Sequence, residues 1–311
     1  VSAPRFASWY IDSVHTMAPE LLQFGDRELV FFFGPRSASE LDGAPAHLPM
    51  NRRFFLPLGV DARAFRPYPE LTARADKRFN VLFLGGYFSS APLHRLARGR
   101  NPAWYQRFVR LFEAVPSFRS YAEFEARLEA IELTGFSETE RRALLSGLLA
   151  SRTGLDRIRM LEVVQPLGLT LYGGGWEEVI PEHLGLLEGF AGGSIHEPAL
   201  LSQLLSLSRL SINIHHRQSQ LCDGLNLRVY ETMATGTLLV NDLPEAMGSM
   251  FEEGVEFLSY RSGQELLERS SWALSEPEQA RKIAEAGRRA VMSGHTLQHR
   301  LVELLRVIDE A

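Results

Sequence analysis

One stretch near the C-terminal end constrains the fold more than any other part of the sequence. Residues 223–240 read Asp-Gly-Leu-Asn-Leu-Arg-Val-Tyr-Glu-Thr-Met-Ala-Thr-Gly-Thr-Leu-Leu-Val. Within it, Leu225, Val229 and Met233 recur at steps of four residues, which is typical of an amphipathic helix. A glycine and a short apolar run after a helix indicate a turn into a buried strand. The stretch therefore predicts a helix and a strand of a parallel α/β sheet.

The same stretch carries charged residues on a second helix face. Arg228 and Glu231 are three positions apart and share that face. A guanidinium binds a diphosphate in bidentate fashion, and a carboxylate accepts hydrogen bonds from both hydroxyls of a ribose. Asp223 lies about 12 Å before Glu231 along a helix axis. These residues predict a site for an extended, polyhydroxylated anion such as a nucleotide-sugar. Spacing alone leaves open an ordinary Arg/Glu surface pair.

Strand-like and helix-like segments alternate from Val81 onward, which is typical of a parallel sheet covered on both faces. The predicted fold class is therefore α/β. Residues 1 to about 75 have the pattern of the end of another α/β domain, with buried strands at 28–33 and 54–61. A long helical insertion is predicted between about 102 and 165, where periodic apolar residues indicate packing.

Length, composition and charge exclude several classes of protein. With 311 residues, 45% hydrophobic and 23% charged, the chain can form two hydrophobic cores. The net charge is −5, so the chain lacks the excess of positive charge that attracts nucleic acid or an anionic membrane. We expect neither as a partner. No apolar run approaches the ~18 residues of a membrane span. We expect a cytoplasmic protein without an integral membrane span.

Cys222 is the one cysteine, so an internal disulfide and a cysteine-based metal cluster are excluded. We expect it to fill space beside Asp223, although a reactive nucleophile is the alternative. The sequence starts at Val1 and enters folded-looking sequence at once, which predicts that upstream residues are missing.

Several motifs, taken in order, carry a family resemblance. They occupy residues 81–86, 171–173 with Trp176, 210–215, 228–231, 234–236, 241–242, and 294–296 with Arg300. Over about 81 to 305 the chain resembles the C-terminal, donor-binding domain of GT-B glycosyltransferases. Within them it is most similar to the spore-maturation-protein-like (CgeB-like) group.

The resemblance implies a GT-B type fold with two Rossmann-like domains, the N-terminal one truncated. Residues 1–75 would be the end of the acceptor-side domain. Residues 76–298 would form the nucleotide-sugar-binding domain, including the insertion, and 299–311 a C-terminal helix that packs back toward the N-terminal domain. The implied activity is metal-independent and cofactor-free transfer of a sugar from a UDP-like donor to a sugar, glycan or protein acceptor.

The resemblance also implies site residues, most of them at the carboxyl ends of strands, where doubly wound sheets bind ligands. The expected donor-binding residues are Gly86, Arg95 (with Arg98 as rival), His196, His215, Asn226, Arg228, Tyr230 and Glu231. Asp223 stands where many retaining GT-B enzymes have the first of two glutamates, and is a catalytic candidate. Asp12 and His15 are candidates for a general base on the acceptor side.

Several of these residues have simpler alternative roles. Gly173 to Gly175 are expected to form a flexible turn instead of a phosphate loop, because a bare glycine run is weak evidence. His196 has the alternative of capping the helix that follows it. A metal site at His215 and His216 is not expected, since adjacent side chains of an extended chain point to opposite sides.

Two other functions remain open at this point. A non-catalytic module would keep the nucleotide pocket and lack a working acceptor side. A sugar-nucleotide epimerase of related fold would form product with no acceptor present.

Overall fold

The structure is a computed structural model, and it describes residues 6–11, 17, 24–25, 28–39, 48–68, 70, 77–99, 101–118, 120–133, 135–242 and 245–310. Asp12 and His15, the two candidates for a general base, lie outside the described residues. Their role stays a prediction.

Two parallel sheets form the framework. The smaller has the order β1-β2-β3, and the larger the order β6-β5-β4-β7-β8-β9. The strands are β1 (Phe6–Tyr10), β2 (Glu28–Phe32), β3 (Arg53–Phe55), β4 (Phe79–Leu84), β5 (Leu169–Tyr172), β6 (Phe190–Gly192), β7 (Ser208–Asn213), β8 (Leu238–Asp242) and β9 (Leu258–Tyr260). The predicted α/β class with a parallel sheet is confirmed.

Helices occupy most of the remaining described residues. The α-helices are α1 (Pro35–Ser39), α3 (Ala91–Arg98), α4 (Pro102–Ala114), α5 (Tyr121–Ala130), α6 (Glu138–Val164), α7 (Leu184–Gly189), α8 (Pro198–Ser206), α9 (Ser219–Cys222), α10 (Leu227–Ala234), α11 (Glu245–Met250), α12 (Gly263–Ser275), α13 (Pro277–Gly294) and α14 (Leu297–Glu310). Short 3-10 helices are η3 (Met50–Arg52), η4 (Val115–Ser117), η5 (Gln165–Leu167), η6 (Trp176–Glu178) and η7 (Ile180–Glu182). No helix among the described residues is both long and apolar enough to cross a membrane.

The six-stranded sheet carries a hydrophobic core on each face. Val81 and Phe83 of β4 belong to one core, and Leu82 and Leu84 belong to the other, because successive side chains of a strand point to opposite faces. Residues of α6, α12 and α13 complete the first core, and residues of α8 and α10 pack in the second. The sheet is thus covered on both sides, and its carboxyl edge stays available for a site.

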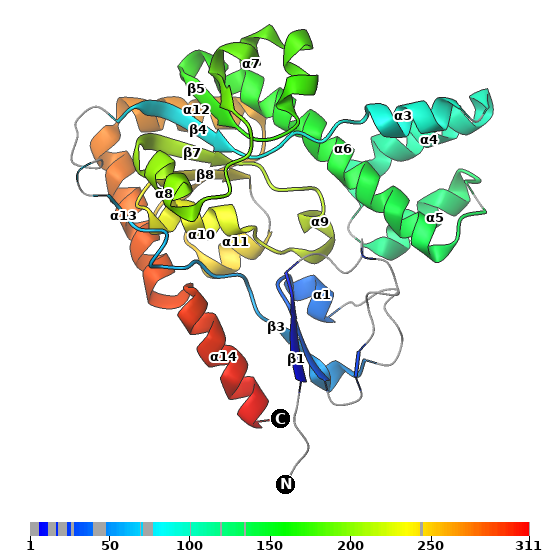
Figure 1. The fold of residues 1–311 in the computed structure, drawn as a ribbon, viewed down its shortest axis with the longest axis horizontal. Coiled ribbons are helices and arrows are strands. Elements are labelled where there is room, and N and C mark those ends of the chain that lie inside the picture. Colours follow the sequence, from blue (N-terminus) through cyan, green and yellow to red (C-terminus); the bar gives the residue numbers. More distant parts are fainter. Residues whose placement is uncertain are drawn as a thin grey trace.

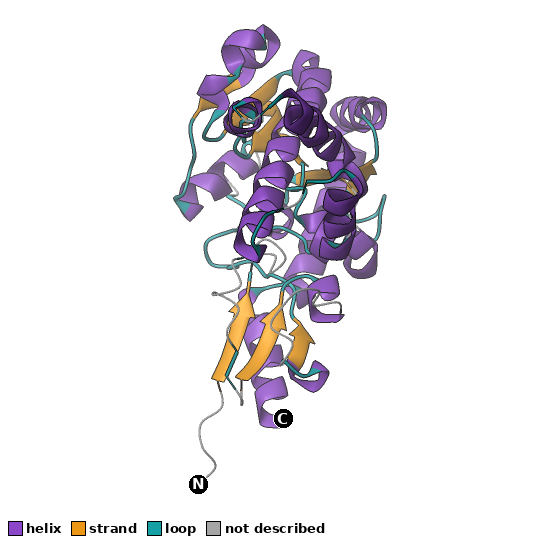
Figure 2. Cartoon of the chain, turned by 90° about the vertical axis from the view of Figure 1, so that its right-hand side faces the viewer, coloured by secondary structure: helices purple, strands orange, loops and turns teal. Residues whose placement is uncertain are grey.

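The small sheet and the large α/β unit are joined by two chain segments that lie side by side. Val60 forms a parallel bridge with Thr296, and the Arg300 guanidinium donates through Nε to the carbonyl oxygen of Leu58 over 3.1 Å. Beyond this crossing, α14 runs down beside the three-stranded sheet (Figures 1 and 2). Its Val307 packs against Phe31 of β2. The expectation that the final helix packs back onto the N-terminal region is confirmed.

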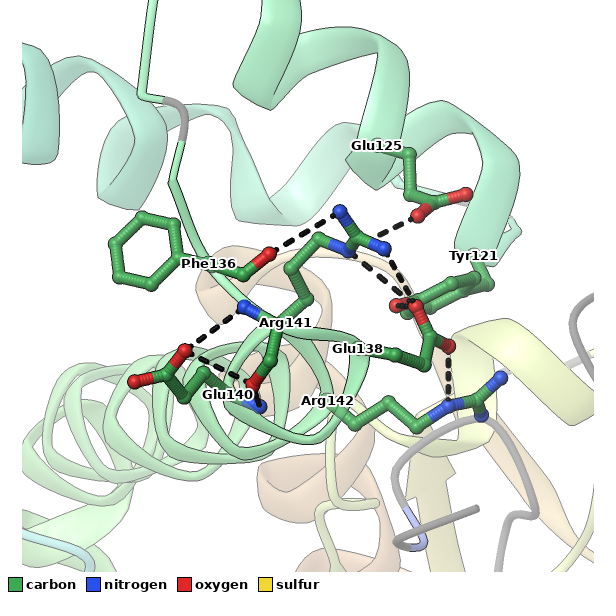
Figure 3. A network of polar contacts seen from close by, with 8 residues as sticks. Tyr121, Glu125, Phe136, Glu138, Glu140, Arg141 and Arg142 are labelled. Atoms are coloured by element: carbon green, nitrogen blue, oxygen red, sulfur yellow. Dashed lines mark hydrogen bonds and ion pairs between the residues drawn. The ribbon is translucent and has the colours of Figure 1, made fainter.

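The helices α3, α4, α5 and the first half of α6 extend to one side of the large sheet (Figure 1) and have an apolar core of their own. Ser137 starts α6 with a capping box to Glu140. Figure 3 shows Glu138 at the centre of a polar network, accepting hydrogen bonds from Tyr121, Arg141 and Arg142. Burial raises the pKa of Glu138, but the hydrogen bonds from these neighbours and the charge of Arg142 together outweigh it and lower the pKa. The carboxylate therefore stays ionised and holds α5 against α6.

Candidate functional site

The carboxyl edge of the large sheet is built from glycine loops that touch each other. The amide of Tyr87 donates to the carbonyl oxygen of Gly174 over 2.9 Å, and a Cβ on Gly173 would lie 2.0 Å from the carbonyl oxygen of Gly85. A Cβ on Gly86 would stand 3.0 Å from Gly174 oxygen. The glycine run after β5 therefore serves close packing of two loops, a more specific reason than the expected flexible turn.

Arg228 and Glu231 meet on α10 and are largely enclosed. Arg228 Nη1 lies 2.7 Å from Glu231 Oε2, and the two side chains are 19% and 11% exposed. Burial lowers the pKa of Arg228 and raises that of Glu231, and in each case the partner's charge opposes the shift. Within the described part of the chain, Nε of Arg228 has no hydrogen-bond partner, and Nη1 contacts Glu231 without hydrogen-bond geometry. An exposed surface pair, the alternative left open by spacing, does not describe this arrangement.

Asp223 has a partner that the sequence did not predict. Its Oδ2 accepts from Arg36 of α1 at 2.6 Å from Nη2 and 3.0 Å from Nε. Asp223 ends α9 in the left-handed conformation, with φ 53°, which Asp tolerates better than most residues. The carboxylate at the position of the first expected acid thus forms an ion pair with Arg36, which belongs to the lobe built on the three-stranded sheet (the small-sheet lobe).

The lobes approach closely beside this ion pair. A Cβ on Gly34 would lie 2.2 Å from the carbonyl oxygen of Cys222, and one on Gly224 would lie 2.2 Å from the Phe33 ring. Cys222 is completely buried, and burial raises the pKa of its thiol to about 12. A protonated, enclosed thiol fits the expected filling role and not that of a nucleophile.

His215 stands just after β7, bound to the last residue of β8. Its Nδ1 is 2.6 Å from Asp242 Oδ1, and its backbone amide donates to Oδ2 over 2.9 Å. The neighbouring His216 has different surroundings, because its ring packs edge-on against Phe88 at 5.2 Å. Burial, followed by the charge of Arg157, lowers the pKa of His216 to about 4, so it is neutral at pH 7.

Arg157 of α6 supplies a cation at the carboxyl edge that the sequence prediction missed. Its guanidinium donates to the carbonyl oxygens of Gly86 and Ile214, which belong to the loops after β4 and β7. Burial lowers its pKa to about 10, against the opposing attraction of Asp242, so the charge persists at pH 7. The long apolar periodicity of the insertion gave no signal for this role. The sequence prediction also missed Asp242, which is the last residue of β8, and Arg36, which closely follows β2. Both lie at carboxyl ends of parallel strands, where such sheets bind ligands.

Asn226 lies at the N-cap position of α10 and exchanges hydrogen bonds with the side chain of Asn213, at 3.1 and 3.2 Å. It therefore lies at the carboxyl edge of the sheet, as expected of a residue in this site.

Three other expected donor-binding residues differ in their burial, and their part in donor binding stays a prediction. Arg95 is exposed on α3, and Arg98 stacks on Tyr105 at 5.3 Å. His196 is exposed, and it does not cap α8, whose N-cap residue is Glu197. Tyr230 is completely buried, with its hydroxyl 3.6 Å from Met250 Sδ, so it contributes to the core.

No three His, Cys, Asp or Glu side chains are grouped to hold a metal ion in the described ranges. The polar groups described above are instead arginine donors, carboxylates, amides and histidines. Such a set can bind an anion together with hydroxyl groups.

Comparison with known proteins gives a family match for half of the molecule. Residues 152–306 match the model of a family described as glycosyl transferase-like. The matched range includes β7, α10, β8 and Arg157. Among curated protein sequences, no significant match was found.

Solved structures of the same architecture show the fold. HepE from Anabaena, solved in complex with UDP and glucose, has a TM-score of 0.57 at 12% identity, covering 99% of this chain and 72% of that one. Sucrose-phosphate synthase from Thermosynechococcus elongatus has a TM-score of 0.54 at 11% identity, covering 94% and 69%. A glycosyltransferase from Rickettsia africae has 0.52 at 11%, covering 90% and 62%. The chain therefore has the predicted GT-B fold and spans about two thirds of the length of these proteins.

Proposed function

We propose that this protein is a glycosyltransferase that transfers a sugar from a nucleoside-diphosphate-sugar to an acceptor. The observation that carries the proposal is the enclosed Arg228–Glu231 pair on α10, in which Nε of Arg228 has no hydrogen-bond partner among the described residues. Buried polar atoms without partners are rare in folded proteins, so their presence beside a sheet edge favours a ligand that satisfies them. A diphosphate fits the guanidinium, and a ribose fits the carboxylate.

The chemistry proposed is stabilisation of the departing diphosphate by positive charge that is already in place. Arg228 would contact the diphosphate, and Arg157 would hold the Gly86 loop and add its buried charge. An acceptor sugar, glycan or protein would enter from the side of the small sheet, and Asp12 and His15 are the proposed general bases. The reaction would need no metal. A cytoplasmic location and membership of the CgeB-like group belong to the same proposal.

The donor site is tested by removing its two charged side chains. Arg228→Ala and Glu231→Ala should each lower UDP affinity at least about tenfold, which is about 1.4 kcal/mol, because each loses a charge-assisted contact. Isothermal titration calorimetry measures the affinity, and thermal unfolding verifies the fold. UDP is the first probe because HepE has been solved with it.

A matched control exists on α13. Arg281 and Glu278 have the same spacing of three residues and a 2.9 Å ion pair, but their side chains are 58% and 77% exposed. Arg281→Ala and Glu278→Ala should leave UDP affinity unchanged. If wild type and both α10 variants bind UDP equally tightly, Arg228 and Glu231 have only a structural role. A wild type that binds no nucleoside diphosphate or nucleotide-sugar would end the proposal.

A non-catalytic nucleotide-sugar-binding module is the second candidate. The observation that favours it is the ion pair with Arg36, which occupies the carboxylate of Asp223. Labelled nucleotide-sugar incubated with the protein distinguishes the two. Transfer, or slow release of free sugar, supports the enzyme, whereas tight binding with the donor intact supports the module.

A further inference from the structure

We propose that His215 and Asp242 act as a unit that binds a hydroxyl group of the transferred sugar. In this unit Nε2 of His215 accepts the hydrogen bond, and Asp242 is a positioning residue. The proposal rests on the proposed glycosyltransferase function and specifies which groups bind the sugar half of the donor.

The hydrogen positions on His215 follow from its partner. Nδ1 faces the Asp242 carboxylate at 2.6 Å, and an ionised carboxylate only accepts hydrogen bonds. The amide nitrogen of Asn213 also lies 3.3 Å from Nδ1, but it donates to Asn226 and Asn241 at 3.2 and 2.7 Å. Nδ1 therefore carries the hydrogen, and in the neutral ring Nε2 is left with a lone pair. The same carboxylate also accepts from the His215 backbone amide at 2.9 Å, so Asp242 fixes both the ring and the main chain.

The backbone on the N-terminal side of His215 is held as well. The Tyr260 hydroxyl donates to the carbonyl oxygen of Asn213 over 2.9 Å, and Arg157 Nη2 donates to that of Ile214 over 3.1 Å. Three consecutive residues are thus fixed by side chains from β8, β9 and α6. Such support around one side chain is what a ligand contact needs in order to keep its geometry before the ligand arrives.

Nε2 of His215, the atom that these contacts hold in place, has no hydrogen-bond partner among the described residues. His215 is only 6% exposed, and its Nε2 is buried without a hydrogen bond to any described residue. An unsatisfied buried acceptor carries a free-energy cost, because it has lost its hydrogen bonds to water. Because a lone pair accepts from O–H or N–H groups, a hydroxyl of a bound sugar would remove this cost.

The His215–Asp242 unit lies near the N-terminal end of α10, and this position indicates which part of the donor it contacts. Asn213 links the His215 region to Asn226, at the N-cap of α10, whereas Glu231 is about 7.5 Å farther along the helix axis. With the ribose at Glu231 and the diphosphate at Arg228, the transferred sugar extends toward the N-terminus of α10. The hydroxyl that reaches Nε2 is therefore assigned to that sugar.

The test compares the affinity for UDP with the affinities for UDP-glucose, UDP-galactose and UDP-N-acetylglucosamine, measured by calorimetry. Wild type should bind at least one of the three more tightly than UDP. His215→Ala should reduce that preference about tenfold, the effect of about 1.4 kcal/mol, and leave UDP affinity unchanged. Asp242→Asn, of nearly the same shape, should reduce the preference in the same direction.

The control is His183→Ala. His183 also faces a carboxylate, Glu162, at 2.5 Å, but Glu162 lies near the end of α6, before β5 begins, and thus at the opposite edge of the sheet. This variant should leave every affinity unchanged. His215→Gln, with an amide oxygen of similar reach, should keep part of the preference that His215→Ala loses.

Two results would overturn the inference while UDP still binds to wild type. Equal losses for UDP and its sugar derivatives in the folded His215 and Asp242 variants would mean that the pair only maintains the fold. An unchanged preference in His215→Ala would mean that His215 does not contact the sugar. Absence of binding of every nucleoside diphosphate and nucleotide-sugar in wild type is a separate result, which would contradict the proposed function itself.

Discussion

At the scale of single residues, the ion pair between Arg36 and Asp223 changes the role expected of an acid in the site. The resemblance implied that Asp223 contacts the sugar, whereas its carboxylate binds a guanidinium of the small-sheet lobe and is only 17% exposed. Partly shielded pairs of this kind are screened less than surface pairs. We therefore expect Asp223 to hold the lobes together in the absence of ligand.

A double-mutant cycle measures this contact. Arg36→Gln and Asp223→Asn, made singly and together, should show a coupling of about 0.5–3 kcal/mol in the free energy of unfolding, because the residues interact directly. Arg306 and Glu303 on α14, 53% and 47% exposed in their own 2.7 Å ion pair, form the control, with an expected coupling under about 0.5 kcal/mol. A coupling no larger than that of the control would show that the pair does not stabilise the contact between the lobes.

At the scale of elements, α6 connects the helical insertion with both loops of the site. Thr153 Oγ1 accepts from the amide of Arg217 over 2.8 Å, and Asp156 pairs with the Arg217 side chain at 2.5 Å. Gly154 faces the other loop, because a Cβ there would lie 2.3 Å from the carbonyl oxygen of Phe88. The insertion therefore helps to hold both loops of the site in place.

Two glycines of α6 test this connection. Gly to Ala inside a helix usually stabilises by about 0.5–1 kcal/mol. Gly154→Ala should instead lower the free energy of unfolding by about 1–3 kcal/mol and weaken UDP binding, because the backbone at Phe88 must move. Gly147→Ala is the control, since its Cβ would meet only the flexible Leu93 side chain at 3.3 Å. Urea denaturation measures both, and equal effects of the two substitutions would contradict the assigned role of Gly154.

At the scale of the whole molecule, the sequence predicted the elements better than the contacts between them. The parallel sheet and the helical insertion follow from local periodicity, which a sequence displays directly, and the return of α14 is implied by the family resemblance. The resemblance implies an arginine close after the Gly86 loop in the chain, such as Arg95, whereas the arginine whose guanidinium donates to the Gly86 carbonyl oxygen is Arg157, which lies 71 residues after Gly86. The contact of Arg36 with Asp223 spans 187 residues. Side-chain contacts at such separations depend on how strands and lobes are arranged, and no local pattern encodes them.

The two lobes face each other where Asp223 meets Arg36, with the carboxyl edge of the large sheet beside this contact. The central claim is that α10 binds a nucleoside diphosphate there through Arg228 and Glu231. A crystal structure of the protein in complex with UDP tests it most directly. We predict the ribose hydroxyls within hydrogen-bond distance of the Glu231 carboxylate and the diphosphate beside the Arg228 guanidinium. UDP bound at another place, with Arg228 and Glu231 still paired only with each other, would contradict the claim.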